Sequence, residues 1–242
     1  MGTSYLYRIF KFNNYFTQFL LVILNIIIYT FSFNFYISVS LVTAIILHEL
    51  GHFCAAKKLK LTVQGCYLIP YVGGALIISD KYQSYKQQLI LAISGPLSGS
   101  LSAILTLVLY IFYKNLYLGT FLYITVIINL CNLLPMSFLD GGQIIESFFS
   151  FYSEKLGLYW KIISSIIISF MLWQINKIIC IATVLLFYPN IRHSYLKILE
   201  NKSSSLEKLD KYDAAMAISA YLIIILLLAM ILYFLITEGS VI

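Results

Sequence analysis

Charged residues are scarce in this chain. Only 11% of its 242 residues are Asp, Glu, Lys or Arg, whereas 61% are hydrophobic, and the mean hydropathy is +0.90. A soluble globular domain carries about 25% charged residues, so this composition excludes one and indicates a membrane protein. Acidic residues are scarcer than basic ones, with 10 against 16. The basic residues lie at the ends of apolar runs and form no stripe with aromatic residues, so we expect no nucleic-acid partner.

Other common features are also missing. The four cysteines are scattered and include no C-x-x-C pair, so we interpret them as small buried thiols. The chain contains no repeat and no low-complexity tract. We expect no cleavable signal peptide, because the first apolar run is long enough to span a membrane and lacks a small-residue cleavage site.

Long apolar runs are what the sequence does contain. They cover about residues 15–33, 36–56, 87–113, 117–136, 160–189 and 213–237. A membrane-spanning helix needs about 20 residues, so the sequence predicts an all-α polytopic protein of the cell membrane with about six to seven transmembrane segments. The number depends on the run 160–189, which is long for one span and short for two, with Asn176 and Lys177 in its middle.

The distribution of basic residues favours a hairpin for this run. If the N-terminus is cytoplasmic and 160–189 returns to its starting side, 14 basic residues are cytoplasmic and only Lys114 and Lys177 face outwards. If the run crosses once, the five basic residues of 192–211 move outside and the bias nearly vanishes. We therefore predict a cytoplasmic N-terminus and a cytoplasmic linker at 190–212.

The second apolar run ends in ionisable residues. His48-Glu49-Leu-Gly-His52 is an H-E-x-x-H motif. On a helix the two histidines lie one turn apart on one face, which suits two ligands of one zinc ion. Glu49 lies beside them, where it can take a proton from a metal-bound water. Ionisable groups at membrane depth are costly, so we interpret all three residues as functional.

A catalytic zinc site needs a third protein ligand and an open position. We predict Asp140 as this ligand, because it is a lone acid in an apolar helix that Pro135 and Gly141-Gly142 interrupt. A broken helix at membrane depth is tolerated where it lines a polar cavity, and the glycines let the backbone approach the metal closely. Glu146, later on the same helix, is a weaker alternative ligand.

The segment 57–85, between the second and third apolar runs, is not a span. Pro70 and Gly73-Gly74 interrupt a stretch of β-branched and aromatic residues, which predicts a short extended or β loop. We interpret Gly73 and Gly74 as an exposed strand edge that captures an unwound substrate by β-addition. The alternative is a hydrophobic loop that rests on the bilayer.

Asparagines inside the apolar runs have two interpretations. One of Asn129 and Asn132 holds the substrate backbone or orients a metal ligand, with Asn132 preferred, or the pair forms interhelical hydrogen bonds that pack the spans together. For Asn25, in the first run, we expect an interhelical hydrogen bond.

These motifs together resemble the site-2 protease family of intramembrane zinc metalloproteases. The resemblance rests, in order along the chain, on His48-Glu-Leu-Gly-His52, Pro70-Tyr-Val-Gly-Gly74, Ser94-Gly-Pro-Leu97 and Asn132-Leu-Leu-Pro-x-x-x-Leu-Asp140-Gly-Gly. It covers roughly residues 36–190 and is closest to the bacterial sporulation-factor type, and putative peptide zinc metalloproteases are also similar. It implies one zinc ion per chain on His48, His52 and Asp140, with Glu49 as catalytic base.

The chain departs from the family pattern in several places. Ser98-Gly99 stands where Ala-Asn is common after Gly-Pro-Leu, and Phe138 stands where proline is usual. Neither change removes a ligand. The nucleotide-sensing domain of the sporulation type and the PDZ domain of other members are not evident, so the family's substrates do not carry over.

The predicted activity is hydrolysis of a peptide bond in a membrane-embedded or membrane-associated precursor, with maturation of a secreted or modified peptide as the candidate process. The expected partners are this precursor and the lipid bilayer. An inactive membrane scaffold and a metal transporter are the alternatives, which the clustered ligands and Glu49 disfavour. The predicted regions are an N-terminal segment with the first transmembrane helix at 1–35, a catalytic membrane core at 36–157, and C-terminal transmembrane segments at 158–242.

Overall fold

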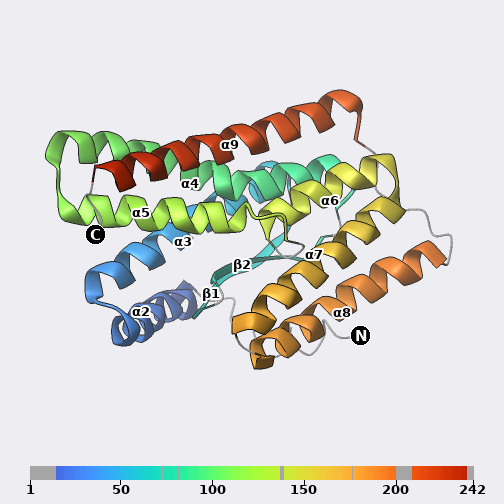
Figure 1. Cartoon of the computed structure of the whole chain (residues 1–242), viewed down its shortest axis with the longest axis horizontal. Coiled ribbons are helices and arrows are strands. Elements are labelled where there is room, and N and C mark those ends of the chain that lie inside the picture. The colour runs from blue at the N-terminus through green and yellow to red at the C-terminus, as the bar shows by residue number, and fades with distance from the viewer. Residues whose placement is uncertain are drawn as a thin grey trace.

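Helices make up most of the protein. The computed structural model describes residues 15–71, 73–80, 82–136, 139–175, 177–199 and 209–238. Its helices are α2 (Tyr15–Ser32), α3 (Phe35–Lys58), α4 (Tyr85–Tyr113), α5 (Leu116–Asn132), α6 (Asp140–Tyr152), α7 (Glu154–Ile175), α8 (Lys177–Leu199) and α9 (Lys211–Thr237), and its strands are β1 (Val63–Ile69) and β2 (Gly73–Ile78) (Figure 1). The predicted mostly helical architecture with a short β segment is confirmed.

Three of the described helices, α3, α4 and α9, are long and apolar enough to cross a membrane, and α2 and α5 are shorter apolar helices. Large apolar side chains cover the outer faces of these helices, as at Leu105, Phe112 and Leu226, which are 64%, 79% and 63% exposed. Exposed apolar surface of this extent suits contact with lipid. The full number of six to seven spans stays a prediction.

The long run 160–189 is divided between two helices. α7 and α8 pack against each other; α7 ends at Ile175 and α8 begins at Lys177, in the middle of the run. α8 continues through Pro189 to Leu199, so the first part of the segment predicted as a linker, 190–212, is helical. The end of an apolar run need not be the end of a helix, because helical backbone hydrogen bonds can continue through polar residues.

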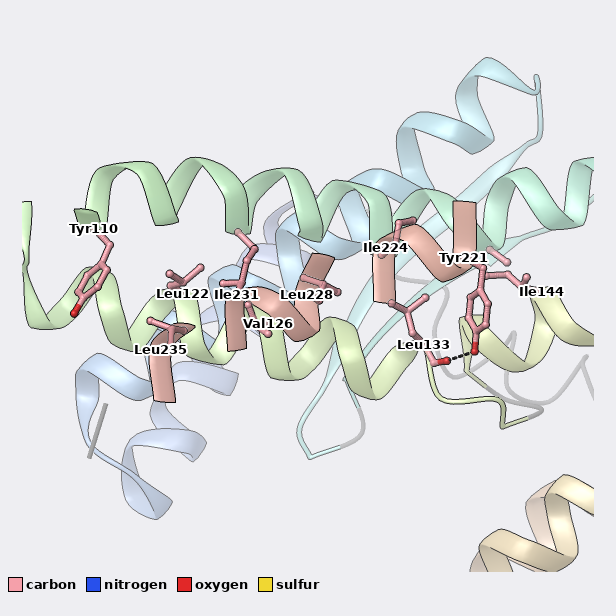
Figure 2. Close-up of a cluster of buried hydrophobic side chains, with 12 residues drawn as sticks. Tyr110, Leu122, Val126, Leu133, Ile144, Tyr221, Ile224, Leu228, Ile231 and Leu235 are labelled. Atoms are coloured by element: carbon pink, nitrogen blue, oxygen red, sulfur yellow. Dashed lines mark hydrogen bonds between the residues drawn. The ribbon is translucent and has the colours of Figure 1, made fainter. Parts of the chain in front are cut away.

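The main hydrophobic core lies between α9 and the pair α4–α5. α9 contributes buried residues at helical spacing, namely Tyr221, Ile224, Leu228, Ile231 and Leu235, and these pack with Tyr110, Leu122, Val126, Leu133 and Ile144 (Figure 2). Such 3-4 spacing puts one face of α9 on its neighbours and leaves the other face outside. The Tyr221 hydroxyl donates a hydrogen bond to the Leu133 carbonyl oxygen (2.7 Å), which fixes the C-terminal end of α5.

Ion pairs hold α9 at both of its ends. Lys86 Nζ lies 2.8 Å from Asp213 Oδ2 near the start of α4, and Lys114 Nζ lies 2.7 Å from Glu238 Oε2 near its end. α4 and α9 therefore run side by side in the same direction (Figure 1). Both lysines are more than half exposed, so these pairs fix alignment rather than contribute much stability.

The two strands form an antiparallel hairpin in which Ile69 pairs with Gly73 and Val63 with Ile78. The predicted strands are thus present. An isolated hairpin is at best marginally stable, and this one is supported by contacts of β1 with α2 and of both strands with α3. The hairpin connects the end of α3 to the start of α4.

Candidate metal centre

The H-E-x-x-H motif is helical and buried. His48, Glu49 and His52 lie in the C-terminal half of α3 and are 3%, 7% and 8% exposed. The His48 Nε2 and His52 Nε2 atoms are 3.1 Å apart, as expected for residues one turn apart on one face. The predicted arrangement of the pair is therefore present in the fold.

Asp140 completes a triangle with the two histidines. It is the first residue of α6, it is buried, and its Oδ2 atom lies 3.0 Å from His48 Nε2 and 3.2 Å from His52 Nε2. Asp140 lies 88 positions after His52 in the sequence, so the fold brings these residues together. Among the described residues, they form the one group of His, Cys, Asp or Glu that could hold a metal ion.

Hydrogen bonds on the far side of each ring determine the histidine tautomers. Asn129 donates through Nδ2 to the Thr125 carbonyl oxygen (2.7 Å), so its Oδ1 faces His48 Nδ1 at 2.9 Å and must accept the proton there. His52 Nδ1 lies 2.8 Å from the Leu91 carbonyl oxygen and likewise donates. Both Nδ1 atoms carry hydrogen, which leaves both Nε2 lone pairs directed at Asp140.

This donor set fits a metal cation. Two bare ring nitrogens and a carboxylate oxygen within 3.2 Å repel one another, and Asp140 Oδ2 has no hydrogen-bond partner among the described residues. A single proton on one nitrogen would leave the other nitrogen still facing lone pairs. Tetrahedral zinc with bonds of about 2.0–2.1 Å holds His nitrogens and carboxylate oxygens at separations similar to these. Two histidines and one acid also leave a fourth position open, as catalytic zinc requires.

Glycines allow α4 to reach the histidine pair. A Cβ atom at Gly95 would overlap His52 Nε2, and one at Gly51 would overlap the Ser94 carbonyl oxygen. Ser98 donates a hydrogen bond from Oγ to the Leu47 carbonyl oxygen (2.7 Å), which joins α4 to α3 at the same level. The Ser94-Gly-Pro-Leu97 motif therefore lies directly against the metal ligands.

Gly99 provides the space that Asn129 occupies. A Cβ atom at Gly99 would overlap the Asn129 amide, which is fully buried. The site-2 protease family commonly has asparagine at the position of Gly99. That side chain would overlap the Asn129 amide where Asn129 now lies. The departure from the family pattern at Gly99 therefore has a physical explanation: an amide on α5 fills that space.

Gly141, the first of the two glycines after Asp140, makes its close contact with the end of α5. The glycines were expected to let the backbone approach the metal, and at Gly141 a Cβ atom would overlap the Leu133 and Leu134 carbonyl oxygens. Gly141 therefore permits the start of α6 to lie against the end of α5. Its effect on the metal centre is indirect, because this contact is what brings Asp140 to the histidines.

A cavity of about 260 Å³ opens beside the three ligands. Glu49 lines it next to β2, and a Cβ atom at Gly74 would overlap the Glu49 carboxylate. Asn132 and Gln143 add amide groups to the lining of the same cavity. The cavity is large enough to admit a segment of extended peptide beside the open metal position. Its full lining is His48, Glu49, His52, Gly74, Ala75, Leu76, Tyr82, Leu91, Ala92, Asn132, Asp140 and Gln143.

The two asparagines of α5 are in different places. Asn129 contacts His48, whereas Asn132 lines the cavity and donates from Nδ2 to the Ile128 carbonyl oxygen (3.1 Å). The sequence analysis preferred Asn132 for holding the substrate backbone or orienting a ligand, but the contact with His48 belongs to Asn129. Gln143 was not singled out at all, although its position one turn after Asp140 was a usable signal.

The remaining polar candidates lie away from the triangle. Glu146, considered as an alternative ligand, pairs with Lys161 of α7 at 2.9 Å and is absent from the metal cluster. Asn25, expected to bond another helix, donates instead to the Leu68 carbonyl oxygen of β1 (3.2 Å). Phe138 lies outside the described residues.

Asn129→Ala is expected to lower zinc affinity by about 10–100-fold, because loss of an outer hydrogen bond to a ligating histidine typically has that effect. Asn132→Ala is the matched control, since it removes an amide from the same helix without touching a ligand. Competition with a fluorescent zinc chelator measures both. Equal affinities for the two variants would contradict the assigned contact.

Comparisons with known proteins agree with the geometry. Peptidase family M50 matches residues 36–120 of the chain. A zinc metalloprotease of Methanocaldococcus jannaschii is 29% identical over 185 residues, which cover 72% of this chain and 54% of the relative, so the chain spans about half the length of that protein. The solved structure of the site-2 protease from the same organism aligns with a TM-score of 0.48 and 23% identity, covering 81% of this chain and 93% of the other. The family match and the curated relative, together with motifs whose side chains converge on one point, confirm the resemblance to the site-2 protease family found in the sequence.

Proposed function

We propose that the protein is an intramembrane zinc metalloprotease that hydrolyses a peptide bond in a membrane-embedded or membrane-associated precursor. The observation that carries this proposal is the convergence of two bare Nε2 atoms and one carboxylate oxygen beside a cavity that Glu49 also lines. This combination supports an enzyme, because a site that only binds or transports a metal has no need of a general base such as Glu49.

His48, His52 and Asp140 would hold the zinc ion. When bound, zinc supplies Lewis acidity to the attacked carbonyl and to the attacking water. Glu49, buried on the cavity wall, takes the proton that this water loses and delivers it to the leaving amine, so the proton balance of hydrolysis closes. Asn129 and the Leu91 carbonyl keep both histidine rings in the required orientation.

The substrate would reach the zinc in an extended form. The backbone of β2 at Gly74, Ala75 and Leu76 lines the cavity, so a peptide pairing with that strand would pass in front of Glu49. Asn132, which also lines the cavity, supplies an amide that can bind the substrate backbone. An apolar precursor segment with helix-weakening residues suits such a site, since unwinding it costs little. Maturation of a secreted or modified peptide remains the candidate process.

The structure changes how the strand edge should be tested. Valine at Gly73 and Gly74 together would crowd the edge, but a side chain at Gly74 would also displace Glu49. Loss of cleavage in that double variant would therefore have two causes. Gly73 has open space around it and a φ of +120°, so it can be changed only with backbone strain.

Removal of the metal tests the proposed activity. A synthetic Leu-rich single-span peptide with a central Asn-Gly pair, mixed with the purified protein in detergent, is expected to be cut. A chelator should stop the cleavage, and added zinc should restore it. Cleavage that survives complete zinc removal would contradict the proposal. Zinc flux into liposomes without any peptide cleavage would favour the transporter.

We further propose that the N-terminus and residues 190–212 are cytoplasmic, on the basis of the 14 to 2 distribution of basic residues. Ser204→Cys, in a chain whose own cysteines are replaced, should resist an impermeant thiol reagent applied to intact cells, although Ser204 itself lies outside the described residues. Tyr113→Cys, at the α4–α5 turn, should be labelled readily. The reverse pattern would overturn the orientation.

A further inference from the structure

Helix α2 makes specific polar contacts with the β-hairpin. Asn25, 2% exposed, donates from Nδ2 to the Leu68 carbonyl oxygen of β1 at 3.2 Å. Tyr29, 4% exposed, accepts a hydrogen bond at its hydroxyl from the Tyr71 backbone N–H at 2.9 Å. A buried asparagine and a buried tyrosine hydroxyl on an apolar helix are costly unless paired. Asn25 also donates to the Leu21 carbonyl oxygen of its own helix (2.8 Å), and the bonds to Leu68 and Tyr71 join α2 to the hairpin.

The turn of the hairpin is held in an unfavourable conformation. Tyr71 has a φ of +62°, which is uncommon for a residue with a bulky side chain. Its ring packs edge-on against Tyr29 with centroids 5.3 Å apart, and its hydroxyl lies 2.5 Å from Ser32 Oγ. These contacts with α2 stabilise the conformation and so fix where β2 begins.

The contact of Asn25 also indicates which backbone groups of β2 point away from β1. The Leu68 carbonyl accepts from α2, which agrees with a position whose backbone groups point away from β2. Its partner Gly74 is then also a non-hydrogen-bonded position, with its N–H and C=O directed to the outer edge of β2. The bond from Ser79 N–H to the Thr62 carbonyl agrees, because hydrogen-bonded positions alternate along the strand.

The two edges of the hairpin therefore differ. α2 covers β1 at Leu68, whereas the outer edge of β2 presents the backbone groups of Gly74 and Leu76 at the cavity wall. We propose that Asn25 and Tyr29 are positioning residues that set the register in which an extended apolar substrate segment pairs with β2. This inference rests on the proposed proteolytic function, since the register decides which peptide bond faces Glu49.

A register error would have a defined result. Strand hydrogen bonding and side-chain facing both repeat every two residues, so the alternative register of a loosened hairpin is displaced by two residues. We expect Asn25→Leu and Tyr29→Phe each to yield a second product cut two residues from the wild-type bond. Loss of the hydrogen bond that joins α2 to the hairpin should raise KM by about fivefold.

Mass spectrometry of the products from the Leu-rich peptide measures the register. General destabilisation would lower the total amount of product without changing the ratio of the two cuts. Thr30→Val is the matched control, because the Thr30 hydroxyl donates to the Ile26 carbonyl of its own helix (2.7 Å). It should yield the single wild-type product.

A second readout does not require cleavage. In the Glu49→Gln protein, a photoreactive residue in the peptide should crosslink to one position of β2, and Asn25→Leu should add a crosslink displaced by two residues. Unchanged products, KM and crosslinks in both α2 variants would overturn the inference. A peptide that crosslinks to β2 in this manner but is never cut by the wild-type protein would refute the proposed function and leave the inference standing.

Discussion

Glu49→Gln is expected to stop peptide cleavage while the zinc content stays the same. Glutamine has nearly the same shape as glutamate but cannot take a proton from water, and loss of general base catalysis typically costs about 10²–10⁴-fold in rate. Glu49 is not one of the three residues that form the candidate metal site, so zinc should remain bound. Rates of peptide cleavage and elemental analysis of the same sample measure both quantities.

Glu146→Gln is the control for this change. Glu146 is a second carboxylate of the membrane core, but it pairs with Lys161 and does not line the cavity. We expect its variant to keep its cleavage rate within a few-fold of the wild type. A Glu49→Gln protein that cuts at a similar rate would show that another group serves as the base.

Asp140→Ala is expected to remove zinc as well as activity. The change deletes the one negatively charged ligand and leaves two bare Nε2 atoms facing each other at 3.1 Å. The loss of zinc affinity should exceed the roughly 10–100-fold effect of losing an outer hydrogen bond. His48→Ala should behave in the same way. Elemental analysis after dialysis against a weak chelator separates both variants from Glu49→Gln.

Full zinc occupancy in the Asp140→Ala protein would exclude Asp140 from the ligand set. Glu146 could not take its place without breaking its ion pair with Lys161. A double variant with Glu146→Gln would test that possibility directly, because it should then lose the zinc that the single variant had kept.

The candidate metal ligands could be predicted from the sequence because their chemistry is local. H-E-x-x-H needs only an α-helix to put His48 and His52 on one face, and an apolar run of this length is helical in a membrane. Asp140 required one further step, the expectation that an acid between helix breakers lines a polar cavity. A short extended or β loop in the segment 57–85 also followed from composition, and the strands Val63–Ile69 and Gly73–Ile78 are present there.

Contacts between segments distant in sequence were not predictable in the same way. A buried asparagine can bond any nearby acceptor, so Asn25 and Asn129 looked alike until the fold placed one against β1 and the other against His48. The role of a glycine likewise depends on what lies opposite it. Gly99 accommodates the Asn129 amide, and Gly141 accommodates the end of α5.

The sequence by itself determined the membrane character, the two-histidine helix and Asp140 as the predicted third ligand, because composition and helical periodicity act over a few turns of one segment. Only the tertiary structure decided how the two histidine rings and Asp140 are oriented and which residues of β2 line the cavity. Those features depend on packing distances between α2, α3, α4, α5 and β2, where one Cβ atom at Gly95 would overlap a ligand nitrogen. Close packing of this kind arises from several segments at once, so no single stretch of sequence contains it.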